Sequence, residues 1–126
     1  MAIGKEVGAF TSTATSMTKA TDSAGNHTFT MNVEGTVSGG WSGAILGTIN
    51  ARSADFTRGT YEADFAAYLD DGSVIAGTAS GVIGATGGHK WQLDGVGLLA
   101  DGTRVGTEGV LELSSRTYNG KMFAIT

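Results

Sequence analysis

The distribution of glycine is the feature of this sequence that most limits what it can fold into. Twenty-one of the 126 residues are glycine, and they lie inside and between short runs of alternating apolar and polar residues rather than in one block. Glycine destabilises a helix interior by about 1 kcal/mol, but in sheets it occurs at bulges, bends and places where two backbones come close. We therefore expect a strongly coiled antiparallel sheet of the kind that closes into a small barrel.

Turn signals recur along the chain at regular spacing, and Asp-Gly pairs between alternating runs are the clearest of them. Seven such signals would join eight strands. The predicted turns are residues 23–26, 38–40, 53–59, 70–72, 86–88 and 101–102, followed by either Ser114-Ser115 or Asn119-Gly120. The predicted strands are residues 5–18, 27–37, 41–52, 60–69, 73–85, 89–99, 103–113 and 116–125.

Alternation within these runs is typical of strands with one buried face. His27, Phe29, Met31 and Val33, for example, share one face, and the polar side chains between them lie on the other. Eight short antiparallel strands joined by tight turns predict an all-β protein, with one domain over residues 1–126 folded as a single eight-stranded antiparallel up-and-down barrel. A sandwich of two sheets is the alternative that the same pattern permits.

Composition excludes several classes of partner. Only 16% of the residues are charged and the formal net charge is −4, so the chain lacks the basic surface that binds nucleic acid or an anionic membrane. Cysteine is absent, and two histidines without a carboxylate cluster are too few for a zinc site, so we expect no metal. The Gly-rich stretch 84–88 lacks the motifs of nucleotide-binding loops, and we expect no cofactor.

The first residues of the chain show no basic segment followed by an apolar stretch, which a signal peptide would need. No run approaches the roughly 18 apolar residues of a membrane helix. We therefore expect a cytoplasmic protein.

An up-and-down barrel places alternate turns at opposite ends. The second, fourth and sixth predicted turns are tight Gly-Gly or Asp-Gly turns, and the first, third, fifth and seventh meet at the other end. Barrel mouths are favoured sites for small ligands. The charged residues and histidines predicted at this second end are Lys19, Asp22, His27, Arg52, Asp55, Arg58, His89, Lys90 and Arg116.

Both histidines continue the apolar faces of their predicted strands, so we expect the two imidazoles to point into the barrel. Imidazole exchanges protons near neutral pH, and a carboxylate or guanidinium beside it would orient it or bind a substrate oxygen. The predicted catalytic residues are His27, His89 and Asp55. The predicted substrate-binding residues are Phe29, Met31, Arg52, Tyr61, Phe65, Trp91 and Tyr118. Each histidine taken alone is also typical of an ordinary turn residue, and the aromatic residues are also typical of a filled barrel core.

The turn Thr86-Gly87-Gly88, with Trp91 and two spaced glycines after it, resembles a turn and strand of the allene oxide cyclase and dirigent barrels. The segments 8–10 and 34–39 are similar to uncharacterised bacterial relatives of that barrel. Lys90 stands where those families usually have another glycine, and none of their catalytic residues maps onto this chain. The resemblance implies an eight-stranded barrel, a homo-oligomer of barrels and cofactor-free cyclisation or isomerisation of an apolar substrate.

The first hypothesis for function is a cofactor-independent isomerase, cyclase or hydro-lyase that acts on a small apolar molecule in the barrel mouth. A non-catalytic binding protein for a small hydrophobic ligand is the alternative, and a structural oligomer with a filled barrel is the third. We also expect a homo-oligomer, a dimer or trimer, because exposed apolar patches commonly form interfaces. The apolar residues predicted on the outer face are Phe10, Leu98, Phe123 and Ile125.

Overall fold

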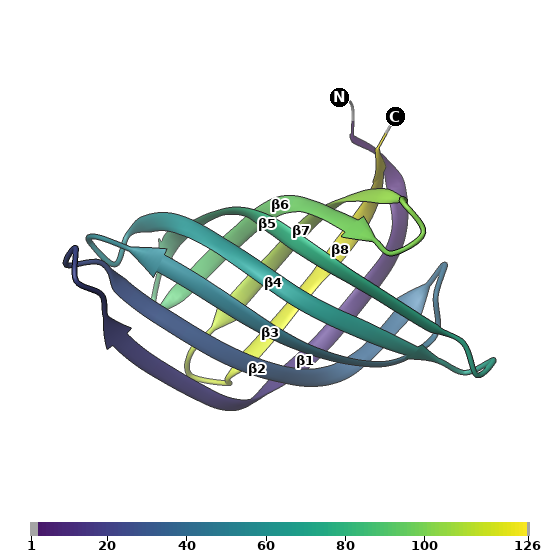
Figure 1. Ribbon diagram of the computed structural model, residues 1–126, viewed down its shortest axis with the longest axis horizontal. Coiled ribbons are helices and arrows are strands. Elements are labelled where there is room, and N and C mark those ends of the chain that lie inside the picture. Colours follow the sequence, from purple (N-terminus) through teal and green to yellow (C-terminus); the bar gives the residue numbers. More distant parts are fainter. Residues whose placement is uncertain (1–2, 126) are drawn as a thin grey trace.

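The computed structural model describes residues 3–125, which form one closed barrel of eight antiparallel strands (Figure 1). Each strand pairs with its neighbours in the chain, and β8 pairs with β1. The strands are β1 (Ile3–Thr21), β2 (His27–Gly39), β3 (Gly43–Ser53), β4 (Arg58–Leu69), β5 (Val74–Gly87), β6 (Lys90–Leu99), β7 (Arg104–Glu112) and β8 (Thr117–Ile125). The predicted up-and-down barrel is confirmed, and the two-sheet sandwich is wrong. Within residues 3–125, no helix is long and apolar enough to cross a membrane.

The last turn, for which the sequence left two alternatives, contains Ser114-Ser115. β7 ends at Glu112 and β8 begins at Thr117. The pair Asn119-Gly120 lies inside β8, where Gly120 is opposite Gly109 of β7.

Glycines on the inner face let neighbouring strands approach closely. Gly81 of β5 and Gly95 of β6 face each other across the ladder. A Cβ on Gly81 would overlap the carbonyl oxygen of Asp94, and a Cβ on Gly95 would overlap the hydroxyl of Tyr61. The coiling expected from the glycine content therefore depends on particular positions where only glycine leaves room for the neighbouring strand.

Inward side chains pack into two buried clusters. One cluster contains Met31, Val33, Ile49, Tyr61, Ile83, Leu93 and Tyr118, and the other contains Val37, Ala67, Val105 and Met122. Leu93 and Val105 are the most buried of these side chains, with exposed fractions of 1% and 2%.

Phe10 lies on the inner face of β1, and its predicted place on the outer wall is wrong. Its ring packs against Tyr118 with the centroids 5.1 Å apart. The neighbours of Phe10 on the same face are the small residues Gly8 and Ser12. Gly8 leaves room for the larger inward side chain of Trp41, so this inward face does not show an apolar pattern in the sequence. Leu98 is exposed on the outer wall, as predicted.

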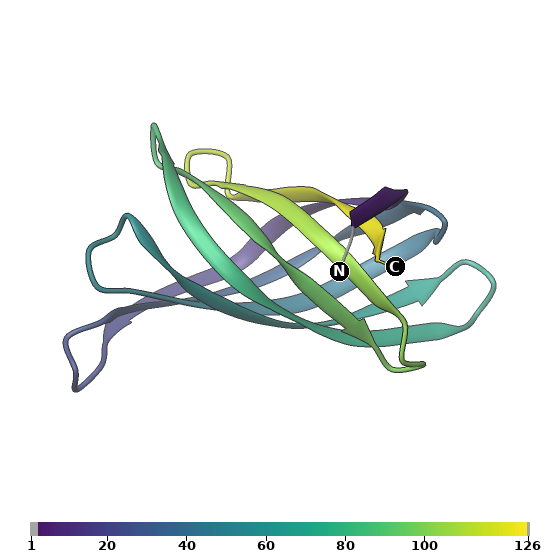
Figure 2. The same ribbon diagram turned by 90° about the horizontal axis from the view of Figure 1, so that it is seen from above.

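The two ends of the barrel differ in their turns (Figures 1 and 2). The β1–β2, β3–β4, β5–β6 and β7–β8 turns meet at one end, which we call the mouth and which lies at the left in Figure 1. The β2–β3, β4–β5 and β6–β7 turns meet at the other, which we call the tight-turn end. Each tight turn has a glycine with positive φ, namely Gly39, Gly72 and Gly102 at 92°, 90° and 90°.

β1 extends beyond its neighbour β8 toward the mouth. β1 pairs with β2 as far as Thr21, whereas its pairing with β8 ends at Thr13. One further backbone bond joins Ala14 N–H to the Arg116 carbonyl at 2.8 Å. From Ser16 onward, β1 is therefore hydrogen-bonded along one edge only.

Candidate ligand-binding site at the barrel mouth

A cavity of about 370 Å³ opens at the mouth. Small-molecule pockets typically have volumes of roughly 300–1,000 Å³. The apolar side chains that line it are Met17, Phe29, Met31, Ile49, Ala51, Phe56, Ile83, Trp91, Leu93, Leu111 and Leu113. The polar and charged residues that line it are Thr18, Lys19, Thr30, Ser53, Thr57, Arg58 and Arg116. The cavity thus combines a mostly apolar wall with three cationic side chains.

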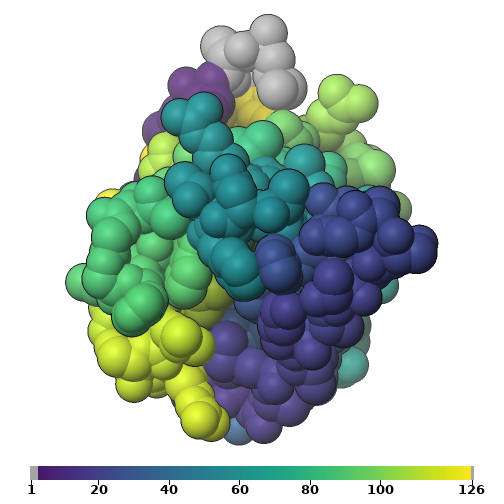
Figure 3. Space-filling model, turned by 90° about the vertical axis from the view of Figure 1, so that its left-hand side faces the viewer, coloured from purple at the N-terminus to yellow at the C-terminus, as the bar shows by residue number. Residues whose placement is uncertain are grey.

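The β3–β4 turn reaches over the mouth, as the teal atoms in Figure 3 show. Asp55 fixes this turn, because its carboxylate accepts hydrogen bonds from the backbone N–H groups of Thr57 and Arg58 at 2.9 and 3.0 Å. The same hydrogen bonds hold the pKa of Asp55 below its usual value. Ser53, which is buried, donates to the Arg58 carbonyl at 2.6 Å and closes the base of the turn.

Phe56 lies in that turn and has a φ of 63°, an uncommon conformation for a residue other than glycine. Its ring stacks on the imidazole of His27 with the centroids 3.9 Å apart and meets the ring of Phe29 edge-on at 6.1 Å. Trp91 Nε1 donates to the Phe56 carbonyl at 3.3 Å, and Lys19 Nζ lies 5.9 Å from the Phe56 ring centroid. Contacts from β1, β2 and β6 thus hold Phe56 against the cavity, which it also lines.

His27 is at the mouth on the inward face of β2, as predicted, but it is not among the residues that line the mouth cavity. Its Nδ1 is buried and has no hydrogen-bond partner among residues 3–125. Asp55 was expected to orient an imidazole. In the structure its carboxylate instead accepts hydrogen bonds from residues of its own turn. The ring of Phe56, not a carboxylate, packs against the imidazole.

His89 is not part of β6, and its predicted inward position is wrong. Gly87, Gly88 and His89 have φ values of 100°, 64° and 57°, so three successive left-handed residues reverse the chain. β6 begins only at Lys90. His89 is exposed in the turn and does not line the mouth cavity.

Arg52 also does not line the cavity. It alternates with Ala51 and Ser53, which both do line it, so Arg52 lies on the outer face of β3. There its Nε is 3.3 Å from Oδ2 of Asp22. The proposed role of Arg52 in binding a substrate inside the barrel therefore has no support in this position.

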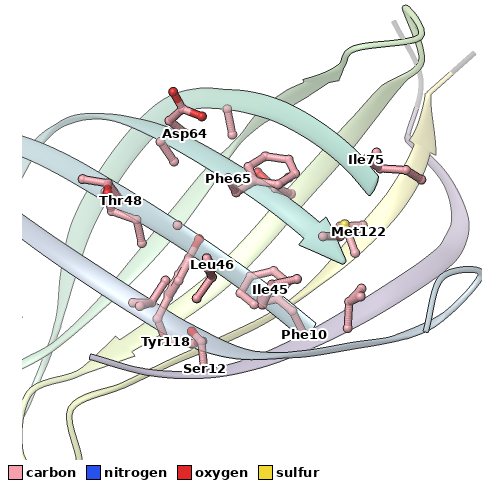
Figure 4. Close-up of a pocket in the computed structure, with 18 of the residues that line it drawn as sticks. Phe10, Ser12, Ile45, Leu46, Thr48, Asp64, Phe65, Ile75, Tyr118 and Met122 are labelled. Carbon is pink, nitrogen blue, oxygen red and sulfur yellow. The ribbon is translucent and has the colours of Figure 1, made fainter. Parts of the chain in front are cut away.

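The remaining predicted binding residues divide between two spaces. Phe29, Met31 and Trp91 line the mouth cavity. Tyr61, Phe65 and Tyr118 line a second, smaller chamber of about 100 Å³ deeper in the barrel. Figure 4 shows this chamber with Phe65 and Tyr118 among the side chains around it. Ile49 lines both spaces.

Polar groups beside the inner chamber bond to one another. The Tyr61 and Thr107 hydroxyls are 3.2 Å apart, and Ser12 Oγ donates to the Tyr118 carbonyl at 2.5 Å. Burial raises the pKa of Tyr61 and raises that of Tyr118 far above its ordinary value, so both phenols stay neutral at ordinary pH. The inner chamber therefore presents an almost entirely apolar surface.

Charged residues at the mouth form two ion pairs, and three cations that line the cavity take part in neither of them. Besides the pair of Arg52 with Asp22, Lys90 Nζ lies 3.3 Å from Oε2 of Glu112. Within residues 3–125, none of the cations that line the cavity has a carboxylate oxygen within 4.0 Å. These three cations are Lys19, Arg58 and Arg116.

Phe56 is the aromatic residue of the cavity lining that the sequence did not predict; the other unpredicted apolar lining residues include Met17, Ile49, Ala51, Ile83, Leu111 and Leu113. Phe56 is a single aromatic residue in a polar turn, outside any alternating run, so periodicity carries no signal for it. Lys19, Arg58 and Arg116 were predicted at this end but had no assigned role, because turn geometry decides which cations face the cavity.

No cluster of three or more potential metal-ligating side chains exists within the described part of the chain, residues 3–125. Comparison of the chain with protein-family models, with curated proteins and with solved structures found no match. The site is therefore interpreted from its own residues.

Proposed function

We propose that this protein binds a small apolar molecule in the mouth cavity without converting it. The cavity of about 370 Å³, with apolar walls from six strands and Phe56 over it, is the observation that carries the proposal. Burying an apolar ligand there gains about 25 cal/mol for each Å² removed from water. The small inner chamber next to Ile49 offers room for the end of a longer ligand.

Binding is favoured over catalysis because the predicted catalytic residues do not come together. General acid–base catalysis needs a base within hydrogen-bond reach of the substrate, commonly oriented by a third group. His89 is in an exposed turn, and the Asp55 carboxylate is bonded to its own backbone. Nδ1 of His27 has no hydrogen-bond partner among residues 3–125 that would orient the imidazole for catalysis.

Calorimetric titration with octanol tests the proposal, because octanol is a neutral molecule with an apolar tail. The variant Ala51→Phe adds a ring to the cavity wall and is expected to weaken octanol binding at least about tenfold. Asn50→Phe is the matched control, since Asn50 is exposed on the outer face of the same strand and should leave binding unchanged. Fluorescence of Trp91 in a Trp41→Phe background, where it is the one remaining tryptophan, gives a second readout.

Circular dichroism must show that both variants fold. Failure of the wild-type protein to bind any octyl compound would contradict the proposal. Equal affinities of Ala51→Phe and Asn50→Phe would contradict the location of the site.

A cofactor-independent isomerase, cyclase or hydro-lyase is the second candidate. Nδ1 of His27 has no hydrogen-bond partner within residues 3–125 and is the observation in favour of this candidate, because an imidazole nitrogen can accept a proton. His27 does not line the cavity itself, so the ring of Phe56 would have to move aside for a substrate to reach it. Cyclohex-3-enone is a suitable probe, since a base can remove its α-proton and return a proton at the γ-carbon, which moves the double bond into conjugation. Absorbance would show this isomerisation, and His27→Gln should abolish it. An equal rate in His27→Gln would exclude this role for His27.

The homo-oligomeric state and the cytoplasmic location stay predictions. Leu98, exposed on the outer wall, and the partly buried Phe123 and Ile125 support the first of them. Light scattering at micromolar concentration and fractionation of the producing cells test the two predictions.

A further inference from the structure

We infer that the ligand of the mouth cavity is an amphipathic anion, whose single negatively charged head binds to Lys19, Arg58 and Arg116 while its apolar tail lies beneath Phe56. The inference rests on the proposed function, because it names the chemical class of the ligand of that same cavity. It adds a head-group requirement that an apolar cavity alone would not impose.

The distribution of charge at the mouth points to an anion. The whole chain has a formal net charge of −4, yet the three charged residues that line the cavity are all cations. The carboxylates at this end are already engaged. Asp22 and Glu112 are in ion pairs on the rim, and Asp55 is bonded to its own turn.

The three cations come from separate parts of the chain and border one space. Lys19 lies near the end of β1, Arg58 begins β4, and Arg116 lies in the β7–β8 turn. Lys19 Nζ donates to Thr21 Oγ1 at 3.0 Å. No hydrogen bond of the Arg58 or Arg116 guanidinium is present within residues 3–125, so both groups keep their donors for a ligand.

An anionic head would complete this arrangement better than a neutral or cationic one. Guanidinium groups bind carboxylate and phosphate oxygens through paired N–H donors. All three cationic side chains are exposed, so their attraction for an anion should be screened by salt. A cationic head would be repelled by three like charges, and a neutral head would leave them without a counter-charge.

Titration with three compounds tests the inference, because each has an unbranched alkyl tail of seven or eight carbons and they differ mainly in the head. Octanoate is the anion, octanol the neutral molecule and octyltrimethylammonium the cation. We expect octanoate to bind at least about tenfold more tightly than octanol, and octyltrimethylammonium to bind more weakly than octanol. Added salt should weaken the binding of octanoate and leave that of octanol unchanged.

The double variant Arg58→Gln/Arg116→Gln should weaken the binding of octanoate much more than that of octanol, and so remove most of the preference for octanoate; Lys19 remains in this variant. Arg52→Gln is the matched control, since this arginine lies at the same end but on the outer face and pairs with Asp22. It should leave both affinities unchanged.

Equal affinities for octanoate and octanol would overturn the inference and leave the proposed function standing. Tighter binding of octyltrimethylammonium would also overturn it. If none of the three compounds binds, the proposed function fails, and the inference fails with it.

Discussion

The mouth and the tight-turn end of this barrel both have turns in which an aspartate side chain accepts a backbone hydrogen bond, but these turns hold different residues. At the tight-turn end, Asp71 and Asp101 accept hydrogen bonds from the backbone N–H two residues later, at 2.9 Å in each case. At the mouth, Asp55 accepts the same kind of bond from Thr57, also at 2.9 Å. The difference is the residue that each turn holds, because the Asp55 turn positions Phe56 against a cavity.

This comparison shows that an aspartate in a turn can be structural even beside a candidate site. The pKa values of Asp55, Asp71 and Asp101 are all lowered, and hydrogen bonds from their own turns are the largest cause in each case. A carboxylate stabilised in this way is a poor general base. What distinguishes the mouth is a cavity with an apolar wall, bordered by three cations that form no ion pair within residues 3–125.

The largest effect is expected where the wall of the mouth cavity is most tightly packed. Leu93→Ala should lower the free energy of unfolding by about 2–5 kcal/mol, because it removes a buried side chain and enlarges a cavity. Leu98→Ala, on the exposed face of the same strand, should change it by less than about 0.5 kcal/mol. Urea denaturation followed by circular dichroism measures both. Similar losses would mean that the mouth half of the barrel lacks a packed wall.

A smaller loss is expected from Gly81→Ala, where the added methyl group would overlap the Asp94 carbonyl oxygen. Relief of that overlap would require the strands to move apart, at a cost of about 1–3 kcal/mol. Gly84→Ala is the control on the same strand, because no atom lies within 4 Å of a Cβ at that position. The melting temperatures of the two variants distinguish a loss caused by the close approach of the strands from the general effect of replacing a glycine. Equal melting temperatures of the two variants would show that β5 and β6 can accommodate a side chain at position 81.

Alkaline pH should destabilise the barrel through the tyrosines of the inner chamber. Burial raises the pKa of Tyr118 in the folded state. The neutral phenol therefore contributes fully to stability below the pKa of an unfolded tyrosine, about 10, and this contribution is lost as pH rises toward the pKa of Tyr118 in the folded protein. Tyr118→Phe should therefore lose stability less steeply above pH ~10 than the wild-type protein. Urea denaturation at a series of alkaline pH values tests this. Identical slopes would show that Tyr118 is ionised as easily in the folded state as in the unfolded one.

The smallest effect contrasts the two kinds of turn directly. Asp55→Ala should loosen the position of Phe56 and weaken octanol binding about three- to tenfold, the scale of one turn hydrogen bond. Asp71→Ala removes the same bond at the tight-turn end and should not change octanol binding. Calorimetric titration measures the affinity of both variants for octanol. Equal affinities would show that Phe56 does not depend on its turn.

The sequence predicted the barrel well because alternation and turn residues are local signals. His27, Phe29 and Met31 keep their period of two through β2, and the structure places all three on the inward face. Phe10 was misplaced because the residues on its face are small, and His89 because three left-handed residues in succession are not visible in the alternation. Phe56 could not be predicted, since its position follows from a turn conformation and from contacts with three distant strands.

The overhang of β1 has a consequence for how fast the cavity can exchange its contents. Residues 16–21 are bonded to β2 alone, whereas the seam of β1 with β8 joins residues as distant in sequence as Ser12 and Tyr118, which are 106 positions apart. Met17 and Lys19 lie on the overhang and line the cavity. Local fraying of this segment costs far less free energy than global unfolding. Its amide hydrogens should exchange with solvent deuterium faster than those of residues 8–13, and a molecule in the mouth could leave at the rate of this fraying while the seam stays intact.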